Sequence, residues 1–484
     1  MTMTREQWCL LGVAAWLVLL PGPLPLIGIA VTGYLSRRHW GVSVSERVRM
    51  VWRECAIWIP ALLVAAMLLA KAPMPRDDLL AIVPIALGDF SHLNFIGSQW
   101  GSFGSPWIGL EWLTAQLVTI SGDKDLAVRL LQSVCVAGTL ALTTLAVRSE
   151  MPSSRRYWLL GLVLVALMLR SGLPIRAVGA RSEAFFGLLV LFAFVARPWA
   201  WLAVGVVMAP LYWLAPIYAP AALLLKATLR VRLAIALSYV AFSAAIWIGF
   251  TEGHWVEWLG QTQQWVGNRI GGAASITENA PVFQALGWPA VLLLCGLFGL
   301  LAVRGAVRRE DWPFAAVIVW FLLPDMIRYV PLVMVVLGVW VARLSERQPL
   351  RIDQHRAAAV IIAPLGAWYL LHGANLGEDE APVFQIPASA AVFAEPAPSY
   401  LRLVYSSQGI RIAPSFEPGA DVPELQEAAL KIAADGEIPC VLLQRYGFEY
   451  LAEKSLRTIP SCLSLAQVSG HWRLWRIANG AQQP

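Results

Sequence analysis

Long apolar runs separated by short basic loops fill the first three quarters of the chain. Several runs approach the roughly 20 residues that cross a bilayer, and their number predicts about 11–13 transmembrane helices. Some runs are short or broken by proline, so tilted or half-spanning helices are expected among them. The apolar segments lie near 8–20, 24–34, 56–70, 125–147, 157–169, 184–196, 199–225, 232–250, 287–303, 312–323, 330–342 and 357–371.

If the chain crosses the membrane in alternating directions, the loops rich in arginine and lysine all lie on the same side of the membrane. These basic loops lie at 35–54, 148–156, 226–232, 304–309 and 343–356. The positive-inside rule assigns them to the cytoplasm, which leaves the segment 72–124 outside. The path requires 199–225 to be a tight hairpin broken near Pro210 and Pro216, and whether 8–34 crosses once or twice stays open.

The sequence after residue 374 differs in its pattern of apolar and polar residues from the membrane core predicted for 1–374. "LRLVYS", "CVLLQR" and "WRLWRI" suggest short strands, and "PELQEAALKIAADG" and a segment around 447–456 suggest helices. This mixture predicts a small α/β domain over 375–484, outside the cytoplasm. Cys440 and Cys462 could pair there if the domain is oxidised, and they remain free thiols if it is reduced.

Composition agrees with a polytopic α-helical membrane protein. Hydrophobic residues make up 58% of the 484 residues and charged residues only 14%, which is too little charge to cover a soluble surface of this size. The net charge of +6 is explained by the cytoplasmic loops, so no nucleic-acid partner is expected. The 23 tryptophans suit the interfacial belts of a multi-pass protein.

Two adjacent carboxylates, Asp77 and Asp78, follow the helix exit in "KAPMPRDDLLAIV". One interpretation is a helix N-cap, since an Asp before an apolar run is a common start signal. The other is an active-site carboxylate that also caps, acting as general base toward an acceptor hydroxyl. The external loop adds Asp89 and His92 among glycines and aromatics, a mixture that suits a re-entrant or interfacial loop lining a cavity.

Arg170, Arg176 and Arg181 are external in "RSGLPIRAVGARSEAFF", against the positive-inside bias. A planar guanidinium fork suits binding of a phosphate, which would explain arginine on the disfavoured side. The alternative is a surface pair between Arg181 and Glu183 or contact with lipid headgroups.

Two further external residues complete the candidate substrate-binding set. His254 lies in a loop rich in tryptophan. The tryptophans suit either stacking of their rings on a sugar or an interfacial helix. Arg328 follows Pro324 at another helix end, close to Asp325, so a local salt bridge competes with a binding role.

"MPRDDLL" resembles the acidic motif in the first external loop of the GT-C class of integral-membrane glycosyltransferases. "GARSEAFF" is similar to Arg-x-Glu motifs of some members, and the closest likeness is to bacterial enzymes that glycosylate type IV pilins with lipid-linked pentoses. The resemblance implies a bacterial inner-membrane enzyme with a periplasmic site, and Asp77 as the base. Here the acids are Asp-Asp where Asp-Glu is commoner, so a divalent cation at the second acid is left open, and no other cofactor is expected.

The resemblance further implies a polyprenyl-phosphate sugar donor and a glycan, lipid or protein acceptor, with pilin among the protein acceptors, all amid membrane lipids. Two other classes compete with this function. A transporter or flippase of lipid-linked sugars would favour inverted repeats and mid-membrane charges. An O-antigen-type ligase or polymerase would favour a large external loop between late helices, whereas the largest one here is early, at 72–124.

Overall fold

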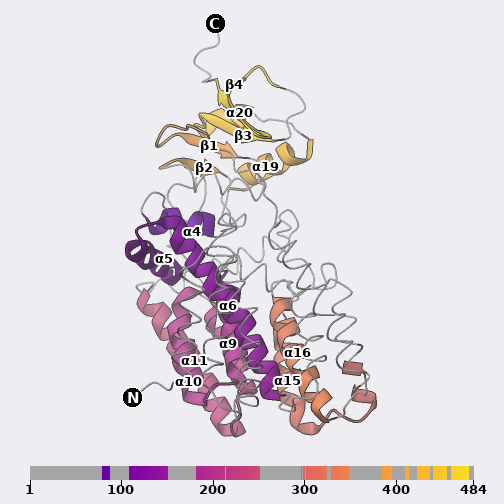
Figure 1. Ribbon diagram of the computed structural model, residues 1–484. Coiled ribbons are helices and arrows are strands. Elements are labelled where there is room, and N and C mark those ends of the chain that lie inside the picture. The colour runs from indigo at the N-terminus through magenta and orange to yellow at the C-terminus, as the bar shows by residue number, and fades with distance from the viewer. Residues whose placement is uncertain are drawn as a thin grey trace, which may run out of the picture.

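A bundle of helices with a five-stranded sheet at one end makes up the part of the chain that the computed structural model describes (Figure 1). The described residues are 79–87, 108–150, 181–212, 214–250, 296, 298–299, 301–323, 329–347, 384–394, 409–413, 422–435, 440–454 and 459–478.

The bundle is built from helices of very different lengths. Its α-helices are α4 (Leu79–Ala86), α5 (Ile108–Ser121), α6 (Lys124–Glu150), α9 (Ser182–Ala193), α10 (Pro198–Met208), α11 (Leu229–Phe250), α15 (Trp312–Leu322) and α16 (Val330–Arg347). Three segments are 3₁₀ helices: η4 (Ala209–Leu211), η5 (Ala215–Leu224) and η7 (Arg309–Asp311). The external segment 72–124 of the sequence analysis therefore contains two helices, α4 and α5, packed on each other and on α6.

Two of the described helices, α6 and α11, are long and apolar enough to cross a membrane by length and composition. They differ in their surroundings. In α6, 56% of the apolar stretch is buried inside the protein, whereas in α11 the share is 17%. Length and composition alone suit a buried core helix as well as a membrane span, so the larger number of spans predicted from sequence stays a prediction.

The directions of the helices follow from contacts at their ends. Glu150, the last residue of α6, pairs with Lys226 just before α11, so α6 and α11 run in opposite directions. Arg343 near the end of α16 also pairs with Glu150, so α16 runs parallel to α6. Asp311 precedes α15 and contacts Arg343, which makes α15 antiparallel to α16. These directions are those that the alternating path through the basic loops requires.

A hairpin broken at proline joins α9 to α11. Helix α10 has 11 residues and η5 has 10, so they span about 16 and 20 Å, and neither crosses an apolar layer of about 30 Å alone. The break between them lies at Pro210 in η4 and Pro216 in η5, as the sequence analysis expected. Buried hydrogen bonds tie it to α11: the indole of Trp247 donates to the carbonyls of Ala209 and Tyr212, at 3.2 and 3.0 Å.

The C-terminal region folds as a mixed sheet with strand order β2-β1-β3-β5-β4. Its strands are β1 (Ala391–Ala394), β2 (Arg411–Ala413), β3 (Tyr450–Glu453), β4 (Leu463–Ser469) and β5 (Trp472–Ile477), with helices α19 (Pro423–Asp435) and α20 (Cys440–Arg445). Strand β1 pairs in parallel with β2 and β3, while β5 is antiparallel to β3 and β4. The short β4–β5 turn uses Gly470 at φ +57°, a conformation that favours glycine.

Two local predictions for this region are wrong. "CVLLQR" is helix α20 and not a strand, because Leu443 alone is fully buried while Val441 points outward, a pattern that fits a short helix covering a sheet. The segment around 447–456 contains strand β3 and not a helix. All four residues of β3 are buried between β1 and β5, and pairing in a central strand outweighs the helical preference of Leu, Ala and Glu.

The sheet buries both faces. On one face, Phe393, Leu451 and Trp475 pack with Leu425 and Ile432 of α19. The alternate residues of the strands, such as Val392, belong to the same buried cluster as the core of the helical bundle. Strand β1 therefore has a continuous apolar sequence, as expected for a strand covered on both sides.

Candidate functional site

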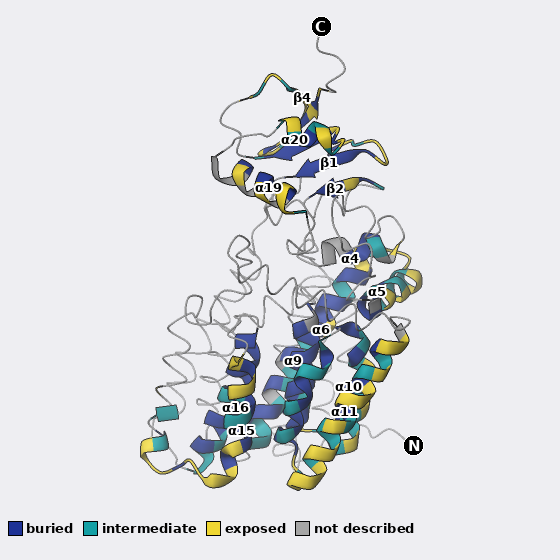
Figure 2. Ribbon diagram, turned by 180° about the vertical axis from the view of Figure 1, so that it is seen from behind, coloured by how far each residue is buried: buried dark blue, intermediate teal, exposed yellow. Residues whose placement is uncertain are grey.

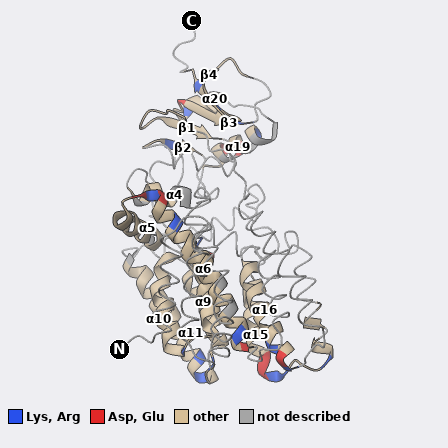
Figure 3. Ribbon diagram, viewed as in Figure 1, with Lys and Arg blue, Asp and Glu red and all other residues tan. Residues whose placement is uncertain are grey.

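The two ends of the helical bundle differ in charge, and the C-terminal sheet lies at only one of them. We call the end where α6 and α16 finish the basic end, and the end where α6 begins the sheet end, because the C-terminal sheet lies there (Figures 1 and 3). Charged residues gather at these ends, and the helices between them are almost free of charge (Figure 3). Of the predicted site residues, the described ones lie at the sheet end.

Arg181 and Glu183 lie at the start of α9, and both side chains are buried, at 7% and 5% exposed. Arg181 is the N-cap residue with extended backbone (φ −67°, ψ 154°), and its carbonyl accepts a hydrogen bond from the Ala184 amide at 2.9 Å. Glu183 in the first turn lies at the positive end of the helix dipole, which stabilises its negative charge. The burial argues against the alternative of a solvent-exposed Arg181–Glu183 surface pair.

The start of α9 lies at the sheet end because α9 runs parallel to α6. The indole of Trp201 in α10 donates to the carbonyl of Leu189 in α9 at 3.0 Å, across a short turn that makes these two helices antiparallel. Helix α10 in turn runs alongside α11 in the same direction, with Trp201 against Tyr239 and Ala209 against Trp247. Since α11 is antiparallel to α6, α9 begins at the end where α6 begins.

Five aromatic side chains form a layer beneath Arg181 and Glu183. Phe186 of α9 stacks on Tyr218 of η5, with ring centroids 4.0 Å apart and planes at 8°. The contacts continue from Tyr218 to Phe321 of α15 at 5.9 Å and from Phe321 to Tyr329 at 6.2 Å. Tyr212 joins through Phe186 at 6.1 Å. This aromatic layer links α9, the broken hairpin, α15 and the start of α16 at one depth.

Gln132 of α6 is a candidate that the sequence analysis did not single out. Its side chain is fully buried, and neither the amide nitrogen nor the oxygen has a hydrogen-bond partner among the residues that the structure describes. Gly138 of α6 meets Leu188 of α9, so in these parallel helices Gln132 and Ser182 lie at a similar depth. An unsatisfied buried amide costs about 1–3 kcal/mol, which calls for an explanation such as a polar ligand. The available signal was a lone glutamine within an apolar helix, in "RLLQSVCV".

The remaining predicted site residues lie outside the described part of the chain. They are Asp77, Asp78, Asp89, His92, Arg170, Arg176, His254 and Arg328. The described helix α4 covers Leu79–Ala86, directly after Asp78 in the sequence. Tyr329, directly after Arg328, belongs to the aromatic layer. The choice between a capping role and a catalytic role for the two aspartates is therefore unchanged by the fold.

At the basic end, an ion-pair network joins the ends of four segments. Arg347 of α16 contacts Asp311 at 2.6 Å and Glu310 at 2.5 Å. Arg343 reaches Asp311 at 3.2 Å and Glu150 at 3.5 Å. Asp311 is buried at 1% exposed, and it also accepts a hydrogen bond from the Arg308 amide. The paired geometry gives these residues a structural role in fixing the helix ends.

The described residues contain no group of three or more His, Cys, Asp and Glu side chains that could hold a metal ion. Both aspartates of "PRDDLL" lie outside those residues.

Cys440 at the start of α20 and Cys462 just before β4 form a disulfide, with Cα atoms 6.4 Å apart. Cys135 in α6 is buried and unpaired, as expected for a packing residue. A disulfide in the C-terminal domain fits an oxidising compartment.

No protein-family model matches the chain, and no curated protein matches it at a significant level.

Proposed function

We propose that this protein is a membrane-embedded glycosyltransferase of the GT-C kind, which moves a sugar from a polyprenyl-phosphate donor to an acceptor hydroxyl on the extracytoplasmic side. The observation that carries the proposal is the buried Arg181 with Glu183 at the sheet end of an apolar bundle. A buried arginine at a bundle end, above an aromatic layer and opposite the basic end, suits a phosphate delivered by a lipid.

A membrane location is supported by the outward face of α11. Leu237 is 71% exposed and Phe242 is 51% exposed, in the middle of a helix with no charged residue after Arg232 (Figure 2). A long helix with apolar residues on all sides is stable in lipid or in a protein core, and this one faces outward. Val207 of α10 and Val319 of α15 are likewise exposed, at 76% and 56%, so the apolar surface is shared by several helices.

In the proposed reaction the acceptor oxygen attacks the anomeric carbon of the donor sugar, and the bond from that carbon to the phosphate oxygen breaks. The Asp77 carboxylate takes the proton of the acceptor hydroxyl. The bonding electron pair leaves with the polyprenyl phosphate, whose added negative charge Arg181 neutralises with its guanidinium fork. The carbonyl and amide of Gln132, which have no partner in the described protein, are available to hydrogen-bond sugar hydroxyls.

The broken hairpin α10–η4–η5 favours a second candidate, a transporter or flippase of lipid-linked sugars. Half-length helices interrupted by proline are typical of transporter sites, where they line a path through the membrane. Both functions use the same lipid-borne substrate, and they differ in whether the bond between sugar and phosphate is broken.

The test incubates the purified full-length protein with polyprenyl-phosphate pentose and hexose donors and an acceptor extract of the same membranes. A transferase releases polyprenyl phosphate, which is measured by thin-layer chromatography, and labels the acceptor. In sealed vesicles, a flippase instead moves the intact donor between leaflets without releasing polyprenyl phosphate. Movement without release would assign the transporter function and reject the transferase.

The acceptor is identified separately by mass spectrometry of surface glycans and glycoproteins in a deletion strain. Loss of one sugar from a single class of molecule is expected, and it names both the sugar and the acceptor. An unchanged surface in a strain that grows under conditions where the protein is made would argue against the transferase.

A further inference from the structure

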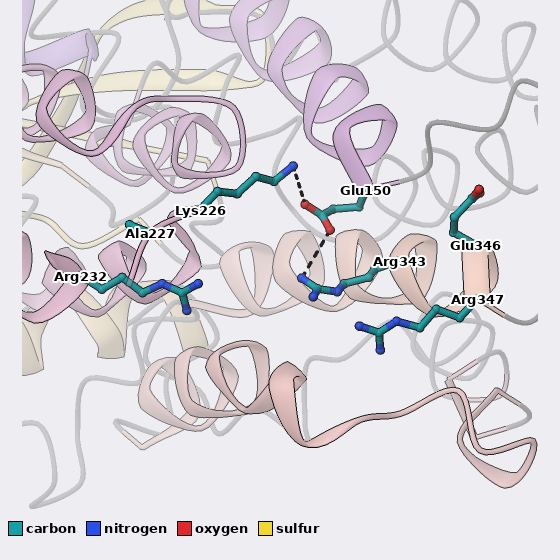
Figure 4. Close-up of a pocket in the computed structure, with 7 residues that line it drawn as sticks. All are labelled: Glu150, Lys226, Ala227, Arg232, Arg343, Glu346 and Arg347. Atoms are coloured by element: carbon teal, nitrogen blue, oxygen red, sulfur yellow. Dashed lines mark ion pairs between the residues drawn. The ribbon is translucent and has the colours of Figure 1, made fainter. Parts of the chain in front are cut away.

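A cavity of about 500 Å³ opens at the basic end (Figure 4). It lies where the end of α6, the connection from η5 to α11 and the last turns of α16 meet. Its lining residues are Glu150, Lys226, Ala227, Arg232, Arg343, Glu346 and Arg347. Four of these seven are cations and two are carboxylates, and Asp311 and Glu310 beside the cavity pair with Arg343 and Arg347.

Three of the four cations are used by the ion-pair network. Arg343 and Arg347 contact Asp311, and Arg343 also reaches Glu150. Lys226 holds Glu150 at 3.1 Å and donates to the carbonyl of Ser149 at 3.3 Å. An ammonium has three donor hydrogens, so Lys226 retains one for another acceptor.

Arg232 is the exception in this cavity. Its side chain forms no ion pair or hydrogen bond with any residue that the structure describes, and its Nε is buried without a partner among them. Its guanidinium extends toward Arg343, a like charge (Figure 4). Arg343 is paired with Glu150 and Asp311, whereas no described carboxylate pairs with Arg232, and a partly buried arginine without a counter-charge is unfavourable.

We propose that this cavity binds a phosphate group, with the guanidinium fork of Arg232 as the principal contact and Lys226 as the second. Arginine binds phosphate oxygens through two parallel N–H donors, and no described residue accepts a hydrogen bond from the guanidinium of Arg232. A cavity of this volume is larger than a phosphate group and therefore also holds part of a headgroup. The site lies at the opposite end of the bundle from Arg181, and it does not depend on the proposed sugar transfer.

Two sources of phosphate fit this chemistry: the headgroup of an anionic phospholipid and a free phosphate compound. The surroundings of Arg232 favour the lipid. Leu229 and Leu233, within one turn on α11, are 50% and 48% exposed, so apolar surface suited to acyl chains adjoins the cavity. Basic residues beside a membrane span are attracted to anionic lipids in the same way.

The test compares the full-length protein with two variants of the same helix start. Arg232→Gln removes the proposed contact, and Arg230→Gln removes an equal charge from an exposed residue that does not line the cavity. Native mass spectrometry counts bound phosphatidylglycerol against phosphatidylcholine, and equilibrium dialysis measures inorganic phosphate. We expect Arg232→Gln to weaken binding of phosphatidylglycerol by about tenfold, and Arg230→Gln to change it by less than about twofold.

The two probes separate the sources of phosphate. Dependence of phosphatidylglycerol binding on Arg232 identifies the lipid, while dependence of inorganic phosphate alone identifies a free compound. Equal binding of both probes by the protein and both variants overturns the proposal, and so does an equal loss in both variants.

A measurement on the unmodified protein covers the case in which Arg232→Gln fails to fold. Phenylglyoxal modifies accessible arginines, and peptide mass spectrometry follows Arg232 and Arg230 separately. Phosphatidylglycerol or inorganic phosphate should slow modification of Arg232 by at least about threefold and leave Arg230 unchanged, since binding occupies only the first. Unchanged modification of Arg232 with both probes rejects the site.

Discussion

Polar side chains inside apolar helices carry most of the functional information at the scale of single residues. Arg181, Glu183 and Gln132 are each buried at a depth where the neighbouring side chains are apolar or aromatic. Burying such groups is unfavourable unless they are paired or bind a ligand, so their presence indicates a ligand or a specific internal contact. Asp311 at the basic end shows an internal contact of this kind, since its carboxylate contacts two arginines and a backbone amide.

For Arg181 we expect the shape of the cation to matter as much as its charge. Arg181→Ala should raise the KM for a polyprenyl-phosphate donor by about tenfold or more, because a hydrogen bond to a charged group is lost. Arg181→Lys should fall between Ala and the unmodified protein, since it keeps the charge and loses the fork. Steady-state kinetics with purified variants measure this, and wild-type constants in both variants would assign Arg181 a structural role.

For the two adjacent acids we expect unequal effects. Asp77→Asn should lower transfer by about 10²–10⁴-fold, the usual cost of losing a general base, while the protein still accumulates in the membrane. Asp78→Asn should have a smaller effect on rate, or lower the abundance, because a lost helix cap costs about 1 kcal/mol. Rates are measured in a purified donor–acceptor assay and abundance by immunoblot. Near-normal transfer in both variants would reduce "PRDDLL" to a helix start.

At the scale of elements, the broken hairpin is held against α11 by close packing at glycine. A Cβ on Gly205 of α10 would meet the ring of Tyr239 in α11 at 2.6 Å, closer than carbon atoms approach. The hydroxyl of Tyr239 donates to the carbonyl of Ala215 at 3.0 Å, so the ring cannot move without breaking this bond. Because residue 205 is a glycine, the Tyr239 ring of α11 can contact α10 while its hydroxyl donates a hydrogen bond to η5.

Gly205→Ala should destabilise the hairpin by about 1–3 kcal/mol, the usual cost of inserting a methyl group into a packed core. The matched control is Gly249→Ala in α11, where a Cβ meets nothing within 4 Å and the helix should be slightly stabilised. Thermal unfolding in detergent compares the two variants. A melting temperature for Gly205→Ala equal to that of Gly249→Ala would contradict the packing derived for this hairpin.

At the scale of the whole molecule, charge and helix direction divide the bundle into two ends. The basic loops around 148–156, 226–232, 304–309 and 343–356 contribute described residues that meet at one end, although they are far apart in the sequence. The sheet and its disulfide lie at the other end (Figure 1). If the basic end faces the cytoplasm, the C-terminal domain lies outside it.

Reporter fusions at two positions test this orientation. A reporter active only in the cytoplasm should be active when fused after Arg347, in the basic end, and silent when fused at Pro484. A reporter active only in the periplasm should give the reverse result at both positions, which controls for expression. Strong cytoplasmic activity at Pro484 would invert the orientation and move Arg181 away from the proposed substrate side.

The sequence determined the features that depend on local pattern. Apolar runs gave helices close to the expected bounds in α6, α9, α11, α15 and α16, because a long apolar stretch satisfies its backbone hydrogen bonds internally when it is helical. Pro210 and Pro216 located the break in the hairpin, since proline cannot donate the backbone hydrogen bond of a continuing helix. Arg181, with Glu183 beside it, was predicted as a binding residue because it lies on the side that the positive-inside rule disfavours for arginine.

Only the tertiary structure decided the features that depend on distant partners. Helix α20 and strand β3 were assigned to the wrong class, because pairing with β1 and β5 and packing on the sheet outweigh local propensity in such short segments. The burial of Gln132, and the lack of a described partner for the Arg232 side chain, could not be read from the sequence, since both depend on which side chains other helices bring near. Hydrophobic pattern fixes where a helix forms, whereas the balance of charges around a side chain is set by packing across the whole bundle.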